Sequence, residues 1–308
     1  MRWIPASVWR MRLRFRLVPS VIVFAVLAAC SGQMSGPPAG ATTAQVEPAG
    51  ELQQFELDDQ GEPRRYDVYA PPGADGGTPL PVVVVLPGSN MQPETMRALT
   101  GFDLLADSNT FLVAYVAAGA GGLDSKLCCG GLDRDVDFVR SAVTAMSGQW
   151  AVDPDRVFAT GFSVGAAMAF KLAVRAPDLF AAVAPVSGGF YPDPRVDAPE
   201  AVVPLAAPAV IAFTGSVDPD SDGIVAGVDL WRLGADCAAP TESDVQGTQG
   251  AARSITECTD GGAVELYTVA GMGHSWPGGG QDAAFADGDS GLVATELIWD
   301  FFAAHQHR

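Results

Sequence analysis

The sequence predicts a single α/β domain with a mainly parallel, doubly wound sheet and helices on both of its faces. Two observations lead to this prediction. Short apolar runs alternate along the chain with segments of helical periodicity. One run, Pro81–Leu86, is continuously apolar, which is typical of a strand that helices bury on both faces. A chain of 308 residues, 48% of them hydrophobic, is long enough to bury one large core.

The expected strands begin near residue 64 and are separated by helical segments. Tyr66–Ala70 alternates between apolar and polar residues, like a half-buried strand. The other expected strands are Pro81–Leu86, Phe111–Val116, Arg156–Thr160, Ala181–Val186, Ala207–Phe213 and Val264–Val269. Apolar residues at helical spacing predict one helix through Val136, Val139, Val143 and Met146, and a last one through Ala294, Leu297, Ile298, Phe301 and Phe302.

The first 50 residues have the composition of an export segment followed by a tether. Five arginines precede an apolar run at 17–30 that is too short to span a bilayer as a stable helix. We expect a signal peptide at 1–29, with Met11 as an alternative start. Because Leu27–Cys30 resembles a bacterial lipobox, Cys30 is the expected site of acylation, and an ordinary signal peptide is the alternative. Residues 30–50 are rich in Gly, Ser, Pro, Ala and Thr, as in a flexible tether.

Charge excludes two classes of partner. The five N-terminal arginines belong to the export segment, and without them 13 basic and 36 acidic residues remain. A body this acidic repels nucleic acid and anionic membrane surfaces. We therefore expect membrane contact only through the N-terminal lipid anchor, on the extracellular or periplasmic face of the cell envelope, or full secretion as the alternative. A monomer is expected.

Four cysteines remain once Cys30 is assigned to lipid. The sequence favours a disulfide between Cys237 and Cys258, which would close a polar loop. The adjacent Cys128 and Cys129 could form a vicinal disulfide, stay reduced or bridge elsewhere. A zinc site is not expected, because there is no second Cys-x-x-Cys and no nearby histidine.

A candidate nucleophile lies between a predicted strand and a predicted helix. Gly161-Phe162-Ser163-Val164-Gly165 is a G-x-S-x-G motif in the strand–turn–helix context that a nucleophile elbow requires. The alternative is a purely structural turn.

The candidate base is fixed by the scarcity of histidine. The chain has three, and two of them lie in the last four residues, so His274 in Gly271–Gly280 is the expected general base. Its small neighbours are expected to let the ring approach the serine. The acid should follow an intermediate strand, and Asp218 after Ala207–Phe213 is our choice, with Asp220 and Asp222 as alternatives. Trp276 is a candidate wall of the substrate pocket or a packed structural residue.

Two backbone N–H groups are expected to bind the oxyanion. One is that of Val164, at the N-terminus of the helix after the serine, and the other is that of Ser89, in the loop after Pro81–Leu86. Ser290, in Gly288-Asp289-Ser290-Gly291, resembles the nucleophile segment of chymotrypsin-type proteases. It follows the histidine in an α/β chain, so we expect it to cap the last helix instead.

With these residues identified, the chain resembles the polyhydroxybutyrate depolymerase and feruloyl esterase group of α/β-hydrolases, from about Arg64 to the last helix. The motifs that carry the resemblance are 81–89, Cys128-Cys129-Gly130 followed by 135–139, 152–165, 215–219, Cys237, Cys258 and 273–278. The resemblance implies a secreted serine esterase with the same Ser163, Asp218 and His274 triad.

Three positions depart from the family's pattern. Pro87-Gly88 replaces the usual His-Gly, which could alter the oxyanion loop without removing its backbone donor. Residues 125–127 replace the usual Trp-Asn before Cys-Cys-Gly, so the acyl pocket could differ. Phe162 and Ser275 exclude the tannase-like branch, which carries cysteines there.

The expected function is an exported serine carboxylic ester hydrolase that needs no cofactor or metal, with residues 51–308 as its catalytic domain. Soluble, short or oligomeric esters are the expected substrates: hydroxyalkanoate oligomers, or feruloyl or acetyl esters on sugars. The alternatives are an exported serine peptidase of related fold and a non-catalytic cell-envelope lipoprotein that retains the fold.

Overall fold

The computed structural model describes residues 47–127, 133–193, 195, 198–259, 262–280 and 283–307. The predictions for the signal peptide, the tether up to residue 46, the acylated Cys30, and Cys128 and Cys129 lie outside these residues. Among these residues, the first element of regular structure is a strand that begins at Glu51.

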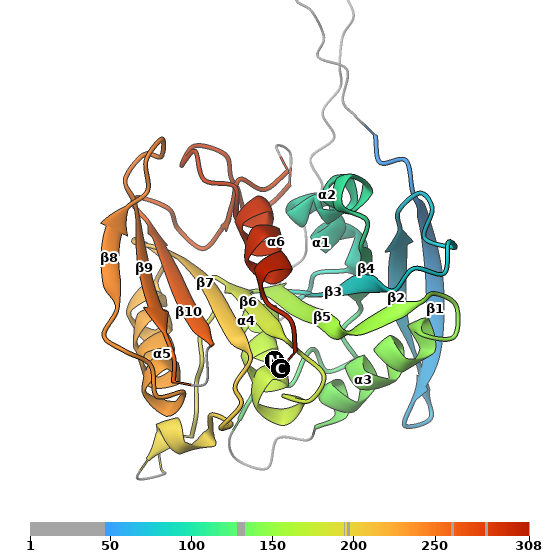
Figure 1. Ribbon diagram of the computed structural model, residues 1–308, viewed down its shortest axis with the longest axis horizontal. Helices are drawn as coiled ribbons and strands as arrows, with labels where there is room; N and C mark the ends of the chain where they lie inside the picture. The colour runs from blue at the N-terminus through green and yellow to red at the C-terminus, as the bar shows by residue number, and fades with distance from the viewer. Residues whose placement is uncertain are drawn as a thin grey trace, which may run out of the picture. The chain divides into compact units, whose positions relative to one another are not determined.

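The described residues form a ten-stranded, mainly parallel sheet (Figure 1). Its strand order is β1-β2-β4-β3-β5-β6-β7-β10-β9-β8. The six strands in the middle of this order (β4, β3, β5, β6, β7 and β10) are parallel to one another, and the two strands at each end pair antiparallel. The strands are β1 (Glu51–Asp59), β2 (Glu62–Ala70), β3 (Leu80–Leu86), β4 (Leu112–Val116), β5 (Val152–Phe162), β6 (Ala182–Val186), β7 (Ala209–Gly215), β8 (Thr241–Asp244), β9 (Ala251–Glu257) and β10 (Ala263–Val269).

Helices cover both faces of this sheet and enclose two hydrophobic cores. One face carries α3 (Arg134–Met146), α4 (Val164–Arg175) and α5 (Ser221–Gly234); the other carries α1 (Pro93–Thr100), α2 (Phe102–Asn109) and α6 (Ala294–Ala304). On β3, Val82 and Val84 pack into the first core, and Val83 and Val85 pack into the second. Burial on both sides explains why this strand is apolar without interruption. No helix among the described residues is both long and apolar enough to span a bilayer.

The predicted doubly wound α/β architecture is confirmed, and all seven expected strands are present within a few residues of their expected ends. Two other predictions, for the segment between the two cysteines and for the start of the last helix, are wrong. The segment between Cys237 and Cys258 is not only a loop, because it forms the antiparallel pair β8 and β9. Ser290 does not cap α6: its Oγ accepts from the N–H of Leu292, and the N-cap residue of the helix is Val293.

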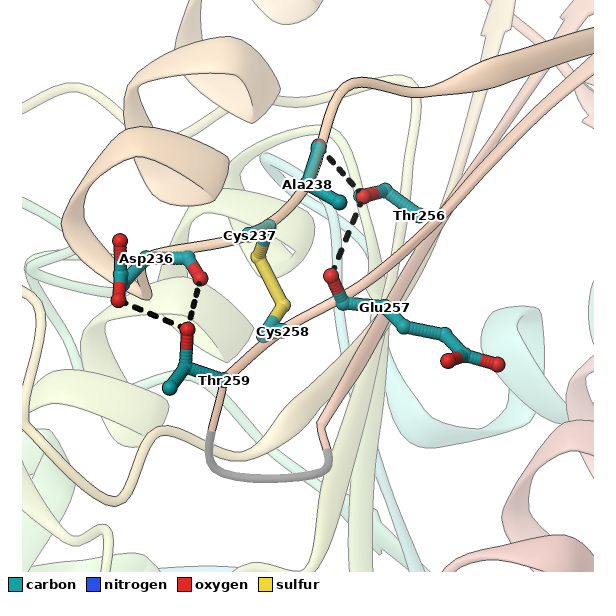
Figure 2. Close-up of a disulfide and its surroundings, with 7 residues drawn as sticks. All are labelled: Asp236, Cys237, Ala238, Thr256, Glu257, Cys258 and Thr259. Carbon is teal, nitrogen blue, oxygen red and sulfur yellow. Dashed lines mark hydrogen bonds between the residues drawn. A yellow bond between two sulfur atoms is a disulfide. The ribbon is translucent and has the colours of Figure 1, made fainter.

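The structure contains the expected disulfide between Cys237 and Cys258, which joins the segment after α5 to the end of β9 (Figure 2). Thr259 reinforces the junction, since its hydroxyl donates to the carbonyl oxygen of Asp236 at 2.8 Å. On the other side of the bridge, the hydroxyl of Thr256 donates to the carbonyl oxygen of Ala238 at 2.6 Å. A structural disulfide of this kind is typical of proteins that fold in an oxidising compartment.

Candidate active site

The expected site residues follow parallel strands, whose carboxyl ends share one edge of the sheet. Ser163 follows β5, Asp218 follows β7, His274 follows β10 and Ser89 follows β3. Loops at this edge are where doubly wound sheets place their chemistry. The sheet topology therefore gathers residues that are more than 180 positions apart in the sequence.

Ser163 occupies a sharp turn between β5 and α4. Its backbone has φ 58° and ψ −117°, a left-handed conformation that is costly for a residue with a side chain. Its N–H donates to the carbonyl oxygen of Val186 on β6 at 3.0 Å, which anchors the turn to the neighbouring strand. A strained, half-buried serine at this position has the geometry of a nucleophile elbow.

Glycines on both sides of the serine permit this turn. A Cβ atom on Gly161 would collide with the backbone of Gly165, and a Cβ atom on Gly165 would collide with the carbonyl oxygens of Leu86 and Pro87. The start of α4 therefore lies directly against β5 and the loop after β3. The two glycines of the G-x-S-x-G motif are thus required because β5, α4 and the loop after β3 are in backbone contact there.

His274 and Asp218 form a hydrogen-bonded pair. The distance from Nδ1 of the histidine to Oδ2 of the aspartate is 2.8 Å, and Asp218 is only 5% exposed. The other carboxylate oxygen, Oδ1, accepts from the backbone N–H of Asp220 at 3.0 Å. A buried carboxylate that accepts from Nδ1 orients the imidazole and leaves Nε2 for a reacting group. The alternative acids, Asp220 and Asp222, are exposed.

The loop of the acid and the loop of the base are joined to each other directly. The N–H of Val217 donates to the carbonyl oxygen of Met272 at 3.1 Å, and the hydroxyl of Ser216 accepts from the N–H of Gly271 at 2.9 Å. Gly215 makes this approach possible, because a Cβ atom there would overlap the carbonyl oxygen of Met272. The loop of His274 can therefore pack this closely only because Gly215, at the end of β7, has no side chain.

The residue before the serine, Phe162, contacts the histidine of this pair. The ring of Phe162 lies against the imidazole of His274, with 4.9 Å between ring centroids. In the part of the chain that the structure describes, the His274 ring hydrogen-bonds to Asp218 and not to the Ser163 hydroxyl. Hydrogen bonds between nucleophile and base are often long in ligand-free enzymes and shorten when substrate is bound.

The two expected oxyanion donors lie on adjoining segments. Gly165 packs against Leu86 and Pro87, so the N-terminus of α4, with Val164, lies beside the loop that leads to Ser89. Ser89 is exposed, within a turn closed by the N–H of Met91 and the carbonyl oxygen of Gly88 at 3.1 Å. Among the described residues, neither the Ser89 nor the Val164 N–H donates to another group, so both are available to a ligand.

Trp276 is a structural residue rather than a wall of the substrate pocket. Its side chain is 0% exposed and packs edge-on against Phe102. Its indole Nε1–H donates to Thr295 Oγ1 at 3.0 Å, and the Thr295 hydroxyl in turn donates to the carbonyl oxygen of Thr100 at 2.6 Å. The side chain thus fastens the segment after His274 to α6 and α1.

The expectation that small neighbours admit the histidine ring also needs correction. A Cβ atom on Gly273 would meet nothing within 4 Å, so no close approach requires glycine there. Farther along the loop, Gly280 does make a close contact: its N–H donates to the carbonyl oxygen of Leu99 at 3.1 Å, and a Cβ atom would strike the carbonyl oxygen of Ala98. The glycine run therefore serves to dock this loop on α1.

Sequence reasoning missed several side chains beside the pair. Phe285 is 50% exposed and packs on Phe162, with 5.5 Å between centroids. Tyr191 is also half-exposed; partial burial, with a smaller contribution from the carboxylates of Asp220 and Asp218, raises its pKa above the usual value. Exposed aromatic residues in loops carry no periodic signal, so the sequence could not single them out.

The described residues contain no group of three or more His, Cys, Asp or Glu side chains arranged to hold a metal ion.

Comparisons with known proteins agree with this architecture. Residues 64–203 match the family model described as Esterase PHB depolymerase. The chain is 32% identical over 255 residues to "Putative esterase NocK" of Nocardia uniformis subsp. tsuyamanensis, covering 71% of this chain and 72% of that protein. It is 31% identical over 130 residues to the Poly(3-hydroxyalkanoate) depolymerase C of Paucimonas lemoignei, covering 40% of this chain and 31% of that protein.

Solved structures share the fold at lower identity. An acetyl xylan esterase from Aspergillus awamori superposes with a TM-score of 0.57 at 21% identity, covering 73% of this chain and 94% of that one. The feruloyl esterase module from Clostridium thermocellum, solved as an S954A mutant with sinapinate, gives a TM-score of 0.55 at 14% identity, with 74% and 83% covered. The fold is that of the α/β-hydrolases. The chain belongs to the esterase PHB depolymerase family and is an ester hydrolase.

Proposed function

We propose that this protein is an exported serine carboxylic ester hydrolase in which Ser163, His274 and Asp218 act as a catalytic triad. The observation that carries the proposal is the 2.8 Å hydrogen bond between His274 and the buried Asp218, at the same sheet edge as a strained serine. The sharp turn at Ser163 and the carboxylate-oriented imidazole of His274 support these roles.

The reaction proceeds in two halves. His274 Nε2 takes the hydroxyl proton as Ser163 Oγ attacks the ester carbonyl carbon, and the N–H groups of Ser89 and Val164 bind the resulting oxyanion. The carbon–oxygen bond to the alcohol then breaks, His274 returns the proton to the departing alkoxide, and the acyl group stays on Ser163. In the second half, water deprotonated by His274 attacks this ester, the bond between the acyl carbon and Ser163 Oγ breaks, and His274 returns the proton to Oγ as the acid leaves. Neither half needs a cofactor.

Short or oligomeric esters are the proposed substrates: hydroxyalkanoate oligomers, or feruloyl or acetyl esters. The names of the relatives support this range, since they include a poly(3-hydroxyalkanoate) depolymerase and a bifunctional acetylxylan esterase/xylanase of Neocallimastix patriciarum. The chain is 31% identical to the latter over 130 residues and covers only 19% of it.

Export with a lipid anchor at Cys30 is part of the proposal. The basic and apolar leader of the sequence supports it, and so does the disulfide between Cys237 and Cys258. In this scheme residues 1–29 are removed, 30–50 form the tether, and 51–308 are a catalytic domain that acts as a monomer.

A fluorophosphonate probe, which labels only an activated serine, tests the triad. We expect the wild-type protein to be labelled and Ser163→Ala to be unlabelled, with hydrolysis of nitrophenyl acetate reduced on the order of 10⁴-fold or more. Ser290→Ala is the matched control, because Ser290 lies in a Gly-Asp-Ser-Gly segment that resembles the nucleophile segment of another protease class, and this variant should be labelled like wild type. A folded wild-type protein that takes no label would contradict the proposal and favour a non-catalytic lipoprotein. Methyl ferulate, acetylated xylan, hydroxybutyrate oligomers and a peptide substrate would then identify the preferred bond.

A further inference from the structure

Ser187, the first residue after β6, combines burial with backbone strain. It has φ 51° and is 1% exposed. Among the described residues other than glycine that have positive φ, it is the one that is buried. Glycine would adopt this conformation without strain. The presence of a side chain at such a position indicates that its hydroxyl has a role.

The hydroxyl of Ser187 contacts the loop of the base. Ser187 Oγ donates to the carbonyl oxygen of Ser275 at 2.9 Å, and Ser275 directly follows His274. This hydrogen bond joins positions 88 residues apart in the sequence. It fixes the peptide unit between Ser275 and Trp276, one residue beyond His274, while the bond from Val217 to Met272 fixes the loop on the N-terminal side.

The backbone around Ser187 contacts the nucleophile and the strand of the acid. Val186 accepts the N–H of Ser163, and Gly188 lies so close to the Ser163 carbonyl oxygen that a Cβ atom would collide with it. The N–H of Ser187 itself donates at 2.9 Å to the carbonyl oxygen of Phe213, on the strand that leads to Asp218. One short segment therefore touches the supports of all three triad residues.

We propose that Ser187 is a positioning residue that holds His274 in register with Ser163. The inference rests on the proposed triad. Proton transfer between Oγ and Nε2 depends steeply on their separation, and displacements of about 1 Å can cost on the order of 100-fold in rate. Without the hydroxyl, the peptide after His274 loses its only side-chain anchor to the segment beside the serine, within the described residues. The ring can then leave the position in which it accepts the proton, although Asp218 still holds Nδ1.

The test compares Ser187→Ala with wild type in four measurements: kcat, KM, the second-order rate of fluorophosphonate labelling, and the melting temperature. We expect kcat and the labelling rate to fall together, about 10- to 100-fold, with KM within about twofold. A loss confined to steps that need the base is the signature of positioning.

Two further variants separate positioning from simple destabilisation. Thr256→Val removes a hydrogen bond of the same kind, from a buried hydroxyl to the carbonyl oxygen of Ala238 at 2.6 Å, on β9 and outside the site. It should lower the melting temperature and leave kcat unchanged. Ser187→Gly removes the hydroxyl while relieving the backbone strain, so it should melt no lower than Ser187→Ala and still lose kcat.

Several results would overturn the inference. Wild-type kcat and labelling in Ser187→Ala or Ser187→Gly would exclude a positioning role, as would a loss of kcat that follows the melting temperature across all three variants. If Ser163→Ala is inactive while the Ser187 variants are not, only this inference fails. If Ser163→Ala keeps wild-type turnover, the proposed triad fails and this inference fails with it.

Discussion

The loop that carries Ser163 and the loop that carries His274 are both rich in glycine, but different forces hold them. In the serine loop, Gly161 and Gly165 are required because backbone atoms occupy the space that a Cβ atom would need. In the histidine loop, Gly273 adjoins the base, yet a Cβ atom there would have open space around it. The serine is positioned by steric contacts of its own short motif.

The histidine loop is positioned by hydrogen bonds from other elements. Two of these hydrogen bonds come from neighbouring loops: Val217, after β7, donates to Met272, and Ser187, after β6, donates to Ser275. The other two go to helices: Trp276 donates to Thr295 on α6, and Gly280 donates to Leu99 on α1. The proposed nucleophile is held by its own motif and the proposed base by distant elements, so the two should respond differently to mutation. Substitutions near the serine should act through sterics, and substitutions at remote supports should act on the base.

Among the substitutions that test this difference between the two loops, the largest effect is expected from Gly165→Ala. The new methyl group would collide with the carbonyl oxygens of Leu86 and Pro87 and push α4 away from β3. We expect an unfolding free energy lower by about 1–3 kcal/mol and ester hydrolysis reduced on the order of 100-fold, because both Ser163 and the Val164 N–H move. Urea unfolding and nitrophenyl acetate turnover measure the two effects.

Gly273→Ala is the matched substitution in the histidine loop. Because no atom lies near the added methyl group, hydrolysis and stability should stay close to wild type even though the change adjoins the base. Equal losses in Gly165→Ala and Gly273→Ala would show that the two loops are held in the same way, contrary to the comparison above.

A smaller effect is expected from Trp276→Phe. The change keeps a buried ring but removes the hydrogen bond to Thr295, at a cost of about 1 kcal/mol in unfolding free energy, and hydrolysis should fall by less than about tenfold. Trp231→Phe is the control, because its buried Nε1 has no hydrogen-bond partner among the described residues. If both variants lose the same stability and neither loses activity, Trp276 does not support the base.

A smaller effect than that of Trp276→Phe is expected from Phe285→Ala, which truncates a half-exposed ring that packs on Phe162. The base and the serine keep their supports, so kcat should hold. KM for an ester with a large acyl or alcohol group should rise by a few fold through lost apolar contact, and KM for an acetate ester should not change. Leu205→Ala, at a residue 98% exposed, controls for loss of a surface apolar group. A Phe285→Ala protein with unchanged KM for every ester would exclude contact with substrate.

Features encoded in a short stretch of sequence were predictable. The apolar runs of β3, β4 and β7 and the strand–turn–helix around Ser163 each carry their own signal. The choice of His274 as the candidate base rests instead on the composition of the whole chain, which has three histidines. The strands β1, β8 and β9 were not predicted. They lie toward the ends of the sheet, where solvent-facing polar residues weaken the apolar pattern.

The supports of the base were not predictable for another reason. Ser187 and Thr295 are ordinary polar residues in sequence, and their roles arise only when partners 88 and 19 positions away fold against them. Trp276, two residues after the base, could be read from sequence as a pocket wall, but packing against α1, α2 and α6 buries it.

The two outer strands of the sheet have a consequence for self-association. Within the part of the chain that the structure describes, β1 and β8 each have one row of backbone N–H and C=O groups that faces no further strand, and pairing of such a row with another chain is a common route to aggregation. β8 is only four residues long and reads Thr-Glu-Ser-Asp, and β1 exposes Glu51, Glu56 and Asp58. A second copy approaching either border meets like charge. The acidic residues of the outer strands, which say little about catalysis, therefore disfavour edge-to-edge pairing of the sheet with another copy of the chain.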